Sequence, residues 1–170
     1  RHFDAGTEDE RFVDLMDILP TVLDVAGVEY YEKPCRENYR LPGGSILPGA
    51  TNDRDRDYQF SAFGRDPRWA LMRDRKYKYM YFHNGGFERF YDLENDPREL
   101  ENLVGTDRLP EADFRRLKAK LVEHETRWGP EEAVESGELA VYEHTPRTDP
   151  HHGPKFPGFA NDQMPVFGTR

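Results

Sequence analysis

The chain has 170 residues, of which 34% are charged, and its formal net charge at pH 7 is −9. A chain of this length can form one ordinary domain, and an apolar content of only 36% predicts a modest hydrophobic core with long polar segments. The acidic balance argues against nonspecific binding to nucleic acid, which needs a basic surface, and no stretch approaches the roughly 20 apolar residues that span a membrane.

The first predicted elements lie near the N-terminus. Residues 10–16 (ERFVDLM) are expected to form a short strand, and residues 17–28 a short helix. Asp17 is the expected N-cap of this helix, Pro20 is tolerated in its first turn, and Gly27 suits the left-handed position that ends it. The helix carries an apolar stripe at helical spacing, formed by Ile18, Val22, Val25 and Ala26.

Two loops are predicted next, over residues 30–49 and 52–57. The second loop (NDRDRD) superficially resembles a calcium-binding loop. However, Asp57 stands where an EF-hand has its glycine, and Phe63 stands where it has its glutamate. We therefore predict a solvated loop of alternating charges instead of a metal site.

An antiparallel sheet is predicted in the middle of the chain, with strands over residues 58–62, 69–73, 76–82 and 87–93. Tyr77, Tyr79 and Tyr81 fall on one face of the third strand, because side chains alternate along a pleated sheet. Residues 83–86 (HNGG) tolerate positive φ, as a tight hairpin requires. Residues 95–97 (NDP) end the fourth strand, since proline cannot donate to a ladder.

The clearest predicted helix covers residues 110–128, from Pro110 to the Gly129-Pro130 stop. Its apolar stripe is expected to cover one face of the sheet and consists of Phe114, Leu117, Leu121 and Trp128. His124 beside this stripe is interpreted as a packing or surface residue. Residues 131–170 show no periodicity and are predicted to form an extended tail, whose histidines lack the spacing of a metal motif.

Several of these segments resemble the sulfatase family in sequence order. Residues 73–79 (RDRKYKY) and 90–103 (FYDLENDPRELENL) are similar to two motifs of that family's small C-terminal subdomain. Residues 17–27 (DILPTVLDVAG) resemble the motif that closes its large domain, and residues 41–48 (LPGGSILP) resemble the connection between the two. The resemblance covers about residues 10–128.

The resemblance implies the C-terminal part of a type I sulfatase of the alkaline phosphatase superfamily. Residues 1–50 would end the large α/β domain, 51–129 would form the small subdomain, and 130–170 would be an irregular tail. The fold class is α+β: a small antiparallel sheet of about four strands packed against a C-terminal amphipathic helix. Because the chain enters this pattern at Arg1, we expect it to be a fragment of a longer polypeptide.

The same resemblance implies a full enzyme that hydrolyses sulfate esters with a formylglycine nucleophile and a calcium ion. Both would lie upstream, so this chain is expected to bind no cofactor, to contain no catalytic or metal-ligating residue and to be inactive alone. Cys35 (PCREN) lacks the downstream proline and arginine of the formylglycine motif and is interpreted as an ordinary cysteine. The expected partners are the N-terminal catalytic portion of the same polypeptide and a sulfated small molecule or glycan. A periplasmic or secreted location is favoured by the resemblance.

Four residues are predicted to bind substrate: Arg65, Arg68, Trp69 and His83. Arg65 and Arg68 lie in the loop between the first two strands, which faces the catalytic cleft in the resembled fold. Guanidinium groups match the geometry of sulfate oxygens. The alternative for these arginines is a surface ion pair with nearby carboxylates.

Three other functions remain open from the sequence. Phosphonate monoester hydrolases and related phosphodiesterases share the fold and similar motifs. A noncatalytic carbohydrate-binding or interaction module would require Tyr77, Tyr79, Tyr81 and Trp69 to be exposed on one flat face. The third alternative is a purely structural lid.

Overall fold

The structure is a computed structural model that describes residues 6, 8, 10–28, 43–48, 50, 57–64 and 68–143. The predictions for Cys35, Arg65, residues 52–56 and the histidines from position 144 onward lie outside the described residues. Among the helices that the structure describes, none has the length and apolar character needed to cross a membrane.

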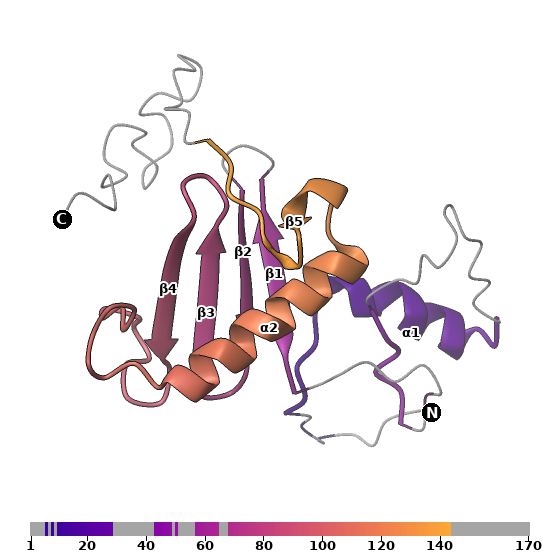
Figure 1. The fold of residues 1–170 in the computed structure, drawn as a ribbon. Coiled ribbons are helices and arrows are strands. Elements are labelled where there is room, and N and C mark those ends of the chain that lie inside the picture. The colour runs from indigo at the N-terminus through magenta and orange to yellow at the C-terminus, as the bar shows by residue number, and fades with distance from the viewer. Residues whose placement is uncertain are drawn as a thin grey trace, which may run out of the picture.

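The centre of the fold is a four-stranded antiparallel sheet (Figure 1). Its strands are β1 (Gln59–Phe63), β2 (Trp69–Arg73), β3 (Tyr77–Phe82) and β4 (Phe87–Asp92), in the order β1-β2-β3-β4. Each strand pairs with its neighbour in sequence, which is the simplest antiparallel arrangement. The predicted sheet is confirmed, with strand boundaries within one residue of those expected.

The hairpin between β3 and β4 depends on its two glycines. Gly85 has φ of +97° and Gly86 has φ of +69°, both in the region that favours glycine. A Cβ on Gly85 would also lie 2.4 Å from the ring of Phe87. The predicted turn at residues 83–86 is therefore confirmed, and Gly85 is required both by its backbone conformation and by the ring that lies against it.

The hydrophobic core lies between one face of the sheet and α2 (Glu111–Trp128), which crosses that face diagonally (Figure 1). Leu117 and Leu121 of α2 are fully buried, as the predicted stripe requires. The ring of Phe114 meets Tyr79 edge-on at 5.4 Å. We call the sheet face toward α2 the inner face and the opposite face the outer face.

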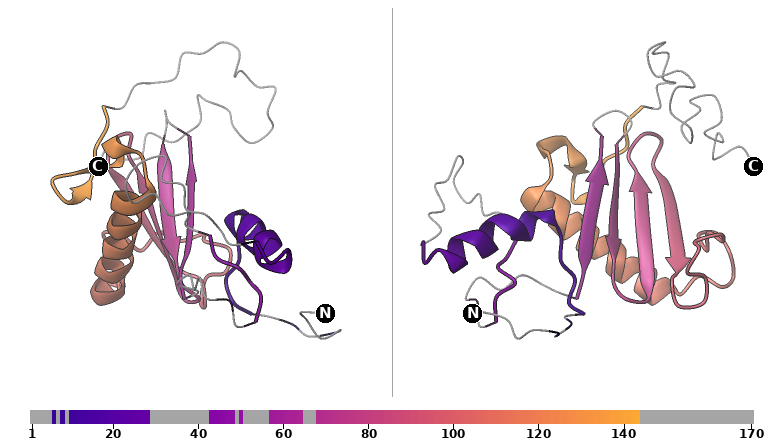
Figure 2. Two further views of the ribbon diagram at one scale, coloured as in Figure 1. Left: turned by 90° about the vertical axis from the view of Figure 1, so that its right-hand side faces the viewer. Right: turned by 180° about the vertical axis from the view of Figure 1, so that it is seen from behind.

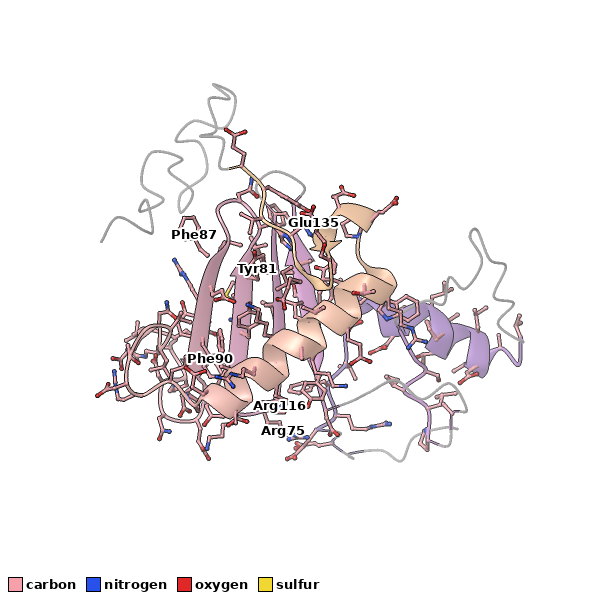
Figure 3. The ribbon with its side chains drawn as sticks, viewed as in Figure 1. Arg75, Tyr81, Phe87, Phe90, Arg116 and Glu135 are labelled. Carbon is pink, nitrogen blue, oxygen red and sulfur yellow. The ribbon has the colours of Figure 1, made fainter. Side chains whose placement is uncertain are left out.

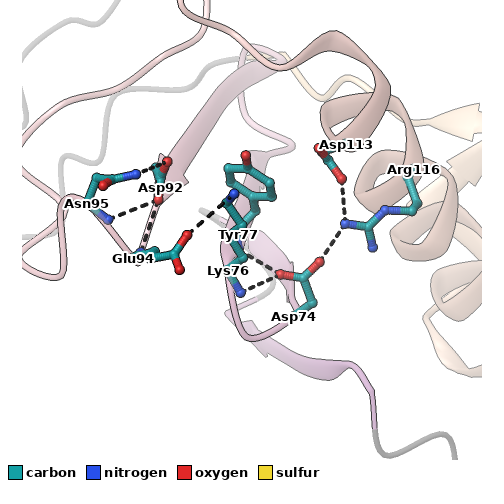
Figure 4. A network of polar contacts seen from close by, with 8 residues as sticks. All are labelled: Asp74, Lys76, Tyr77, Asp92, Glu94, Asn95, Asp113 and Arg116. Atoms are coloured by element: carbon teal, nitrogen blue, oxygen red, sulfur yellow. Dashed lines mark hydrogen bonds and ion pairs between the residues drawn. The ribbon is translucent and has the colours of Figure 1, made fainter.

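The turn between β2 and β3 is joined to α2 through one carboxylate (Figure 4). Asp74 accepts hydrogen bonds from the backbone N–H groups of Lys76 and Tyr77 at 2.8 and 2.7 Å. It also accepts a 2.6 Å hydrogen bond from Arg116, which pairs with Asp113 at 2.9 Å. Arg116 therefore connects α2 to the sheet.

The predicted strand at residues 10–16 is wrong. The segment ends in a 3₁₀ turn, η1 (Leu15–Asp17), and α1 (Ile18–Val25) follows directly. The physical reason is a capping box: Asp14 accepts from the N–H of Met16, and Asp17 accepts from the N–H of Asp14. This arrangement starts a helix, so the chain does not continue as a strand.

Asp17 has a different role from the predicted N-cap of α1. Its buried carboxylate makes no capping hydrogen bond to α1 and accepts one from the N–H of Gly44 at 2.9 Å. A Cβ on Gly43 would lie 2.0 Å from the carbonyl oxygen of Met16, so only glycine allows this close approach. Asp17 thus fastens the segment 43–48 to the start of α1. Figure 2 shows α1 on the side of the sheet opposite α2.

The chain after α2 is more ordered than the predicted irregular tail. It forms η2 (Glu131–Ala133), β5 (Val134–Glu135) and β6 (Glu138–Leu139). The chain then returns to the β3–β4 hairpin, where the N–H of Tyr142 donates to the carbonyl of His83 at 2.7 Å. Up to residue 143, this segment therefore covers the hairpin end of the inner face.

Candidate functional site

Three of the four predicted substrate-binding residues, Arg68, Trp69 and His83, meet at the hairpin end of the sheet, where Arg68 lies beside the β3–β4 hairpin. Arg65 lies outside the described residues. The backbone N–H of His83 donates to the carbonyl of Arg68 at 3.0 Å. The backbone N–H of Arg68 donates to the side-chain oxygen of Asn84 at 2.8 Å. Arg68, Trp69 and His83 are consequently brought together by backbone contacts, although their side chains point to different faces.

Arg68 faces α2 and forms a buried ion pair with Glu125. The Arg68 Nη2 to Glu125 Oε1 distance is 2.5 Å, and the side chains are 10% and 0% exposed. Burial raises the pKa of Glu125 above its ordinary value, although the charge of Arg68 and its hydrogen bond oppose this rise. The alternative of an ion pair for Arg68 is therefore realised, with a carboxylate of α2 instead of a neighbour in the loop.

His83 is fully buried on the same face. Its Nδ1 lies 2.9 Å from the carbonyl oxygen of Ala140, so Nδ1 carries the proton and donates. Its ring stacks on Tyr142 at 5.0 Å and meets Tyr81 edge-on at 5.0 Å. Burial lowers the pKa of His83, the hydrogen bond to Ala140 opposes this, and the nearby Arg68 charge lowers it further.

Arg68, His83 and Glu125 each contain one unsatisfied buried polar atom within the described part of the chain. Arg68 Nε, His83 Nε2 and Glu125 Oε2 have no hydrogen-bond partner among the residues that the structure describes. Buried polar groups of this kind ordinarily bind an internal water. These inner-face residues therefore support the start of β2 from behind. A ligand could reach them only by displacing the segment after α2 that covers them.

Trp69 lies on the outer face, in a row of aromatic residues that the sequence analysis missed. The strand register aligns Phe63 with Trp69, Trp69 with Phe82 and Phe82 with Phe87. The rings of Phe63 and Trp69 stack with centroids 6.1 Å apart. Only the register, which pairs the ends of four strands, could have identified this row. We call Phe63, Trp69, Phe82 and Phe87 the aromatic row.

The tyrosines of β3 do not form an exposed platform. Tyr77, Tyr79 and Tyr81 are buried on the inner face, and Trp69 lies on the other face. The carbohydrate-binding module that needed these four residues on one exposed plane is therefore wrong. The hydroxyl of Tyr79 donates to Glu88 at 2.7 Å, which gives this buried ring its polar partner.

The described residues do not fit a metal centre. No group of three or more His, Cys, Asp or Glu side chains within the described ranges is arranged to hold an ion. His124, predicted to be a packing residue, stacks on Phe60 with ring centroids 3.7 Å apart. The residues at the hairpin end can position a ligand and can contact an anion. No step that breaks a bond is assigned to them.

Comparison with known proteins identifies the family. Residues 1–127 match the family described as N-sulphoglucosamine sulphohydrolase, C-terminal. The arylsulfatase of Clostridium perfringens is 31% identical over 106 residues, which are 60% of this chain and 20% of that protein. Arylsulfatase K of Bos taurus is 30% identical over 116 residues, 59% of this chain and 20% of that protein. The chain spans about a fifth of the length of these relatives.

Solved structures show the same fold. BT4656, solved in complex with its substrate D-glucosamine-2-N,6-O-disulfate, is 26% identical with a TM-score of 0.52, over 65% of this chain and 23% of that one. BT1596, a 2-O GAG sulfatase, is 26% identical with a TM-score of 0.51, over 65% of this chain and 24% of that one. Both matches therefore place this fold within a much longer chain.

Proposed function

We propose a function from one premise: this chain belongs to the N-sulphoglucosamine sulphohydrolase C-terminal family and is the C-terminal part of a sulfatase of the alkaline phosphatase superfamily. The full-length protein hydrolyses the sulfate esters of a sulfated carbohydrate. This chain forms one wall of the substrate cleft and supplies neither the nucleophile nor the metal ligands. The observation that carries this proposal is the match over residues 1–127, which includes the sheet and nearly all of α2.

The substrate class follows from the relatives and from the site. BT4656 takes a disulfated glucosamine as its substrate, and BT1596 is a GAG sulfatase. In this chain, Trp69 of the aromatic row offers a ring to a sugar, and Arg68 fixes the end of the loop in which Arg65 lies. A sulfated glycan is the substrate that these features support best.

The partner of this chain is the upstream catalytic portion of the same polypeptide, and α1 is the element that joins them. The apolar side chains of α1 are largely exposed, which is unfavourable for a surface helix. The exposed large apolar residues of α1 are Ile18, Leu19, Val22 and Val25. An aliphatic stripe of this kind is typical of a helix that packs inside a larger domain.

The calcium ion and the formylglycine nucleophile of the proposed enzyme are assigned to the upstream portion. The described residues contain no cluster able to hold a metal, so no step of the reaction is derived through that ion here. The contribution of this chain is to bind and orient the substrate and to exclude water from one side of the cleft.

Turnover by the full-length protein tests this function. We expect release of inorganic sulfate from N-sulfated or O-sulfated glucosamine, and little hydrolysis of a phosphonate monoester of the same leaving group. Both substrates are assayed at equal concentration, with sulfate measured by ion chromatography. Faster hydrolysis of the phosphonate monoester would contradict the proposal and favour the phosphonate monoester hydrolases.

A further inference from the structure

The chain after α2 returns to the β3–β4 hairpin through residues 140–142, which we call the strap. The strap lies parallel to the tip of the hairpin, with a bridge between Asn84 and Tyr142. The N–H of Tyr142 donates to the carbonyl of His83 at 2.7 Å, and the N–H of Gly85 donates to the carbonyl of Tyr142 at 3.0 Å. These backbone hydrogen bonds fasten the strap to the hairpin end of the sheet.

His83 holds the strap in two further ways. Its Nδ1 donates to the carbonyl of Ala140 at 2.9 Å, and its ring stacks on Tyr142 with centroids 5.0 Å apart. The imidazole is fully buried. The strap therefore depends on the backbone, the ring face and the ring proton of one residue.

The strap begins where the hydrophobic core ends. Leu139, the residue before it, belongs to the core, and its carbonyl accepts from the hydroxyl of Tyr81 at 3.2 Å. Figure 3 shows Tyr81 at the hairpin end of β3, on the side of the sheet that carries α2. The strap itself is held by a few hydrogen bonds, so its release costs less than displacement of α2 from the core.

A second proton on His83 has to bind at Nε2, because Nδ1 already carries the proton that is donated to Ala140. Nε2 is buried and has no hydrogen-bond partner among the described residues. The charge that acts on the imidazole is that of Arg68, which has the same sign as an imidazolium. The ring also meets Tyr81 of β3 and Tyr142 of the strap, and burial raises the pKa of both phenols, so they stay neutral.

The carboxylates around this group do not compensate a charge on His83. Glu125 of α2 is paired with Arg68 at 2.5 Å. Glu138 of β6 and Glu132 of η2 act on the two phenols, whose pKa values they help to raise. Within the described part of the chain, none of the three carboxylates forms a hydrogen bond with His83. An imidazolium would therefore be buried beside a guanidinium with no counter-charge of its own, which is unfavourable unless the ring reaches water.

We propose that the strap is an acid-sensitive switch: uptake of a proton at Nε2 of His83 releases residues 140–142 from the hairpin while the sheet and α2 stay folded. Release gives the imidazolium access to water and opens the hairpin end of the inner face, including the Arg68–Glu125 pair, to solvent. This inference is independent of the proposed function, because it concerns the chain's own contacts and needs no substrate.

Hydrogen exchange in the full-length protein, followed by mass spectrometry, tests the switch. The amides that report release are those of Gly85, Ala140 and Tyr142, which donate across the boundary of the strap. After division by the intrinsic chemical rate, exchange of a peptide that spans residues 140–143 should rise by up to about tenfold from pH 7.5 to pH 5.5. The factor follows from an exposed histidine with a pKa of 6.5 in the open form. A peptide from β3 should exchange more slowly at both pH values.

Two histidine variants locate the group that responds. His83→Asn keeps a donor toward Ala140 but takes up no proton, so the exchange of its strap should be nearly independent of pH. His124→Asn, at a partly exposed histidine of α2 that stacks on Phe60, should keep the wild-type response.

Two results would overturn the switch. One is a strap peptide that exchanges no faster than the β3 peptide at pH 5.5, because the strap would then open only when the whole domain unfolds. The other is the same pH dependence in wild type and His83→Asn, because another group would then respond to acid. If His83→Asn fails to fold, the comparison of the two wild-type peptides still decides.

Discussion

Arg68 and Glu125 show that a residue whose chemistry suggests substrate binding can have a structural role. An arginine in a loop beside a cleft suggests sulfate binding, yet this guanidinium is opposite a carboxylate that has no solvent exposure. Removing either partner of a buried ion pair is destabilising, because the charge that remains is then buried without compensation. The pair connects the β1–β2 loop to α2 and so fixes the start of β2.

Arg68→Met should destabilise the protein by about 3–5 kcal/mol at pH 7, because the Glu125 carboxylate would remain buried without its counter-charge. Since burial already raises the pKa of Glu125, this loss should shrink as the pH falls through that raised pKa and the carboxyl takes up a proton. The free energy of unfolding in urea measures both effects.

Two variants control that experiment. Arg115→Met breaks the exposed pair with Glu111, whose side chains are 78% and 62% exposed, and should cost less than about 0.5 kcal/mol. The double change Arg68→Met with Glu125→Leu should recover most of the loss. A single Arg68→Met variant as stable as wild type would show that the pair contributes nothing.

His83 should make the folded protein less stable as the pH falls. Its folded pKa is lowered, so below the ordinary histidine pKa of 6.5 the unfolded chain binds a proton that the folded chain resists. Stability is thus lost as the pH falls through that value. His83→Asn, which keeps a donor toward Ala140, should reduce the loss between pH 7.5 and pH 5.5 in urea unfolding. Identical pH slopes for the two proteins would refute the assignment.

At the scale of elements, the carboxylate of Asp74 connects the β2–β3 turn of the sheet to α2 through hydrogen bonds. Partial burial alone would raise its pKa, but the hydrogen bonds from the Tyr77 N–H, Arg116 and the Lys76 N–H outweigh this and lower it. A carboxylate with a lowered pKa contributes stability above its unfolded pKa of 3.8 and loses it as the pH falls through the folded value.

Asp74→Asn should therefore cost about 1–2 kcal/mol at pH 7, since the amide keeps an acceptor for the turn but loses the charge that holds Arg116. The difference from wild type should disappear in strong acid. Asp107→Asn, at an exposed turn position, is the matched control and should be neutral. Chemical denaturation at pH 7 and pH 2.5 checks the prediction, and a difference that persists unchanged at pH 2.5 would contradict it.

The elements differ in how far sequence could predict them. Alternation of Tyr77, Tyr79 and Tyr81 and the residues of the hairpin were sufficient for the sheet, because period and turn chemistry are local properties. The segment 10–16 was misassigned because the apolar pair inside it is equally compatible with a strand. Only the reciprocal hydrogen bonds of Asp14 and Asp17 show that the chain forms a helical turn there. The short hairpin after α2 has too few residues for a period to appear.

The candidate site could be predicted only in part, for a reason of geometry. Arg68 and Trp69 are adjacent in sequence and lie on opposite faces, so a list of neighbouring residues cannot describe one surface. The aromatic row is formed by residues from four strands, and their alignment depends on register across three connections. The partner of Arg68 comes from a helix 57 positions away.

At the scale of the whole molecule, α1 indicates how the chain fits into a longer protein. Val22 is 57% exposed here, although it belongs to the apolar stripe of α1. In the full-length protein, Val22→Asp should lower stability by more than about 2 kcal/mol, because the upstream domain would bury an unpaired charge. Leu100→Asp, at a more exposed apolar position, should be nearly neutral. Differential scanning calorimetry compares the two, and equal melting temperatures would argue against packing of α1.

The division of labour along the polypeptide is most directly tested by measuring sulfate release from a sulfated glucosamine oligosaccharide by the full-length protein and by residues 1–170 alone. The account predicts that the full-length protein releases inorganic sulfate and that residues 1–170 release none. Hydrolysis by residues 1–170 alone would contradict it, because the nucleophile would then lie within this chain.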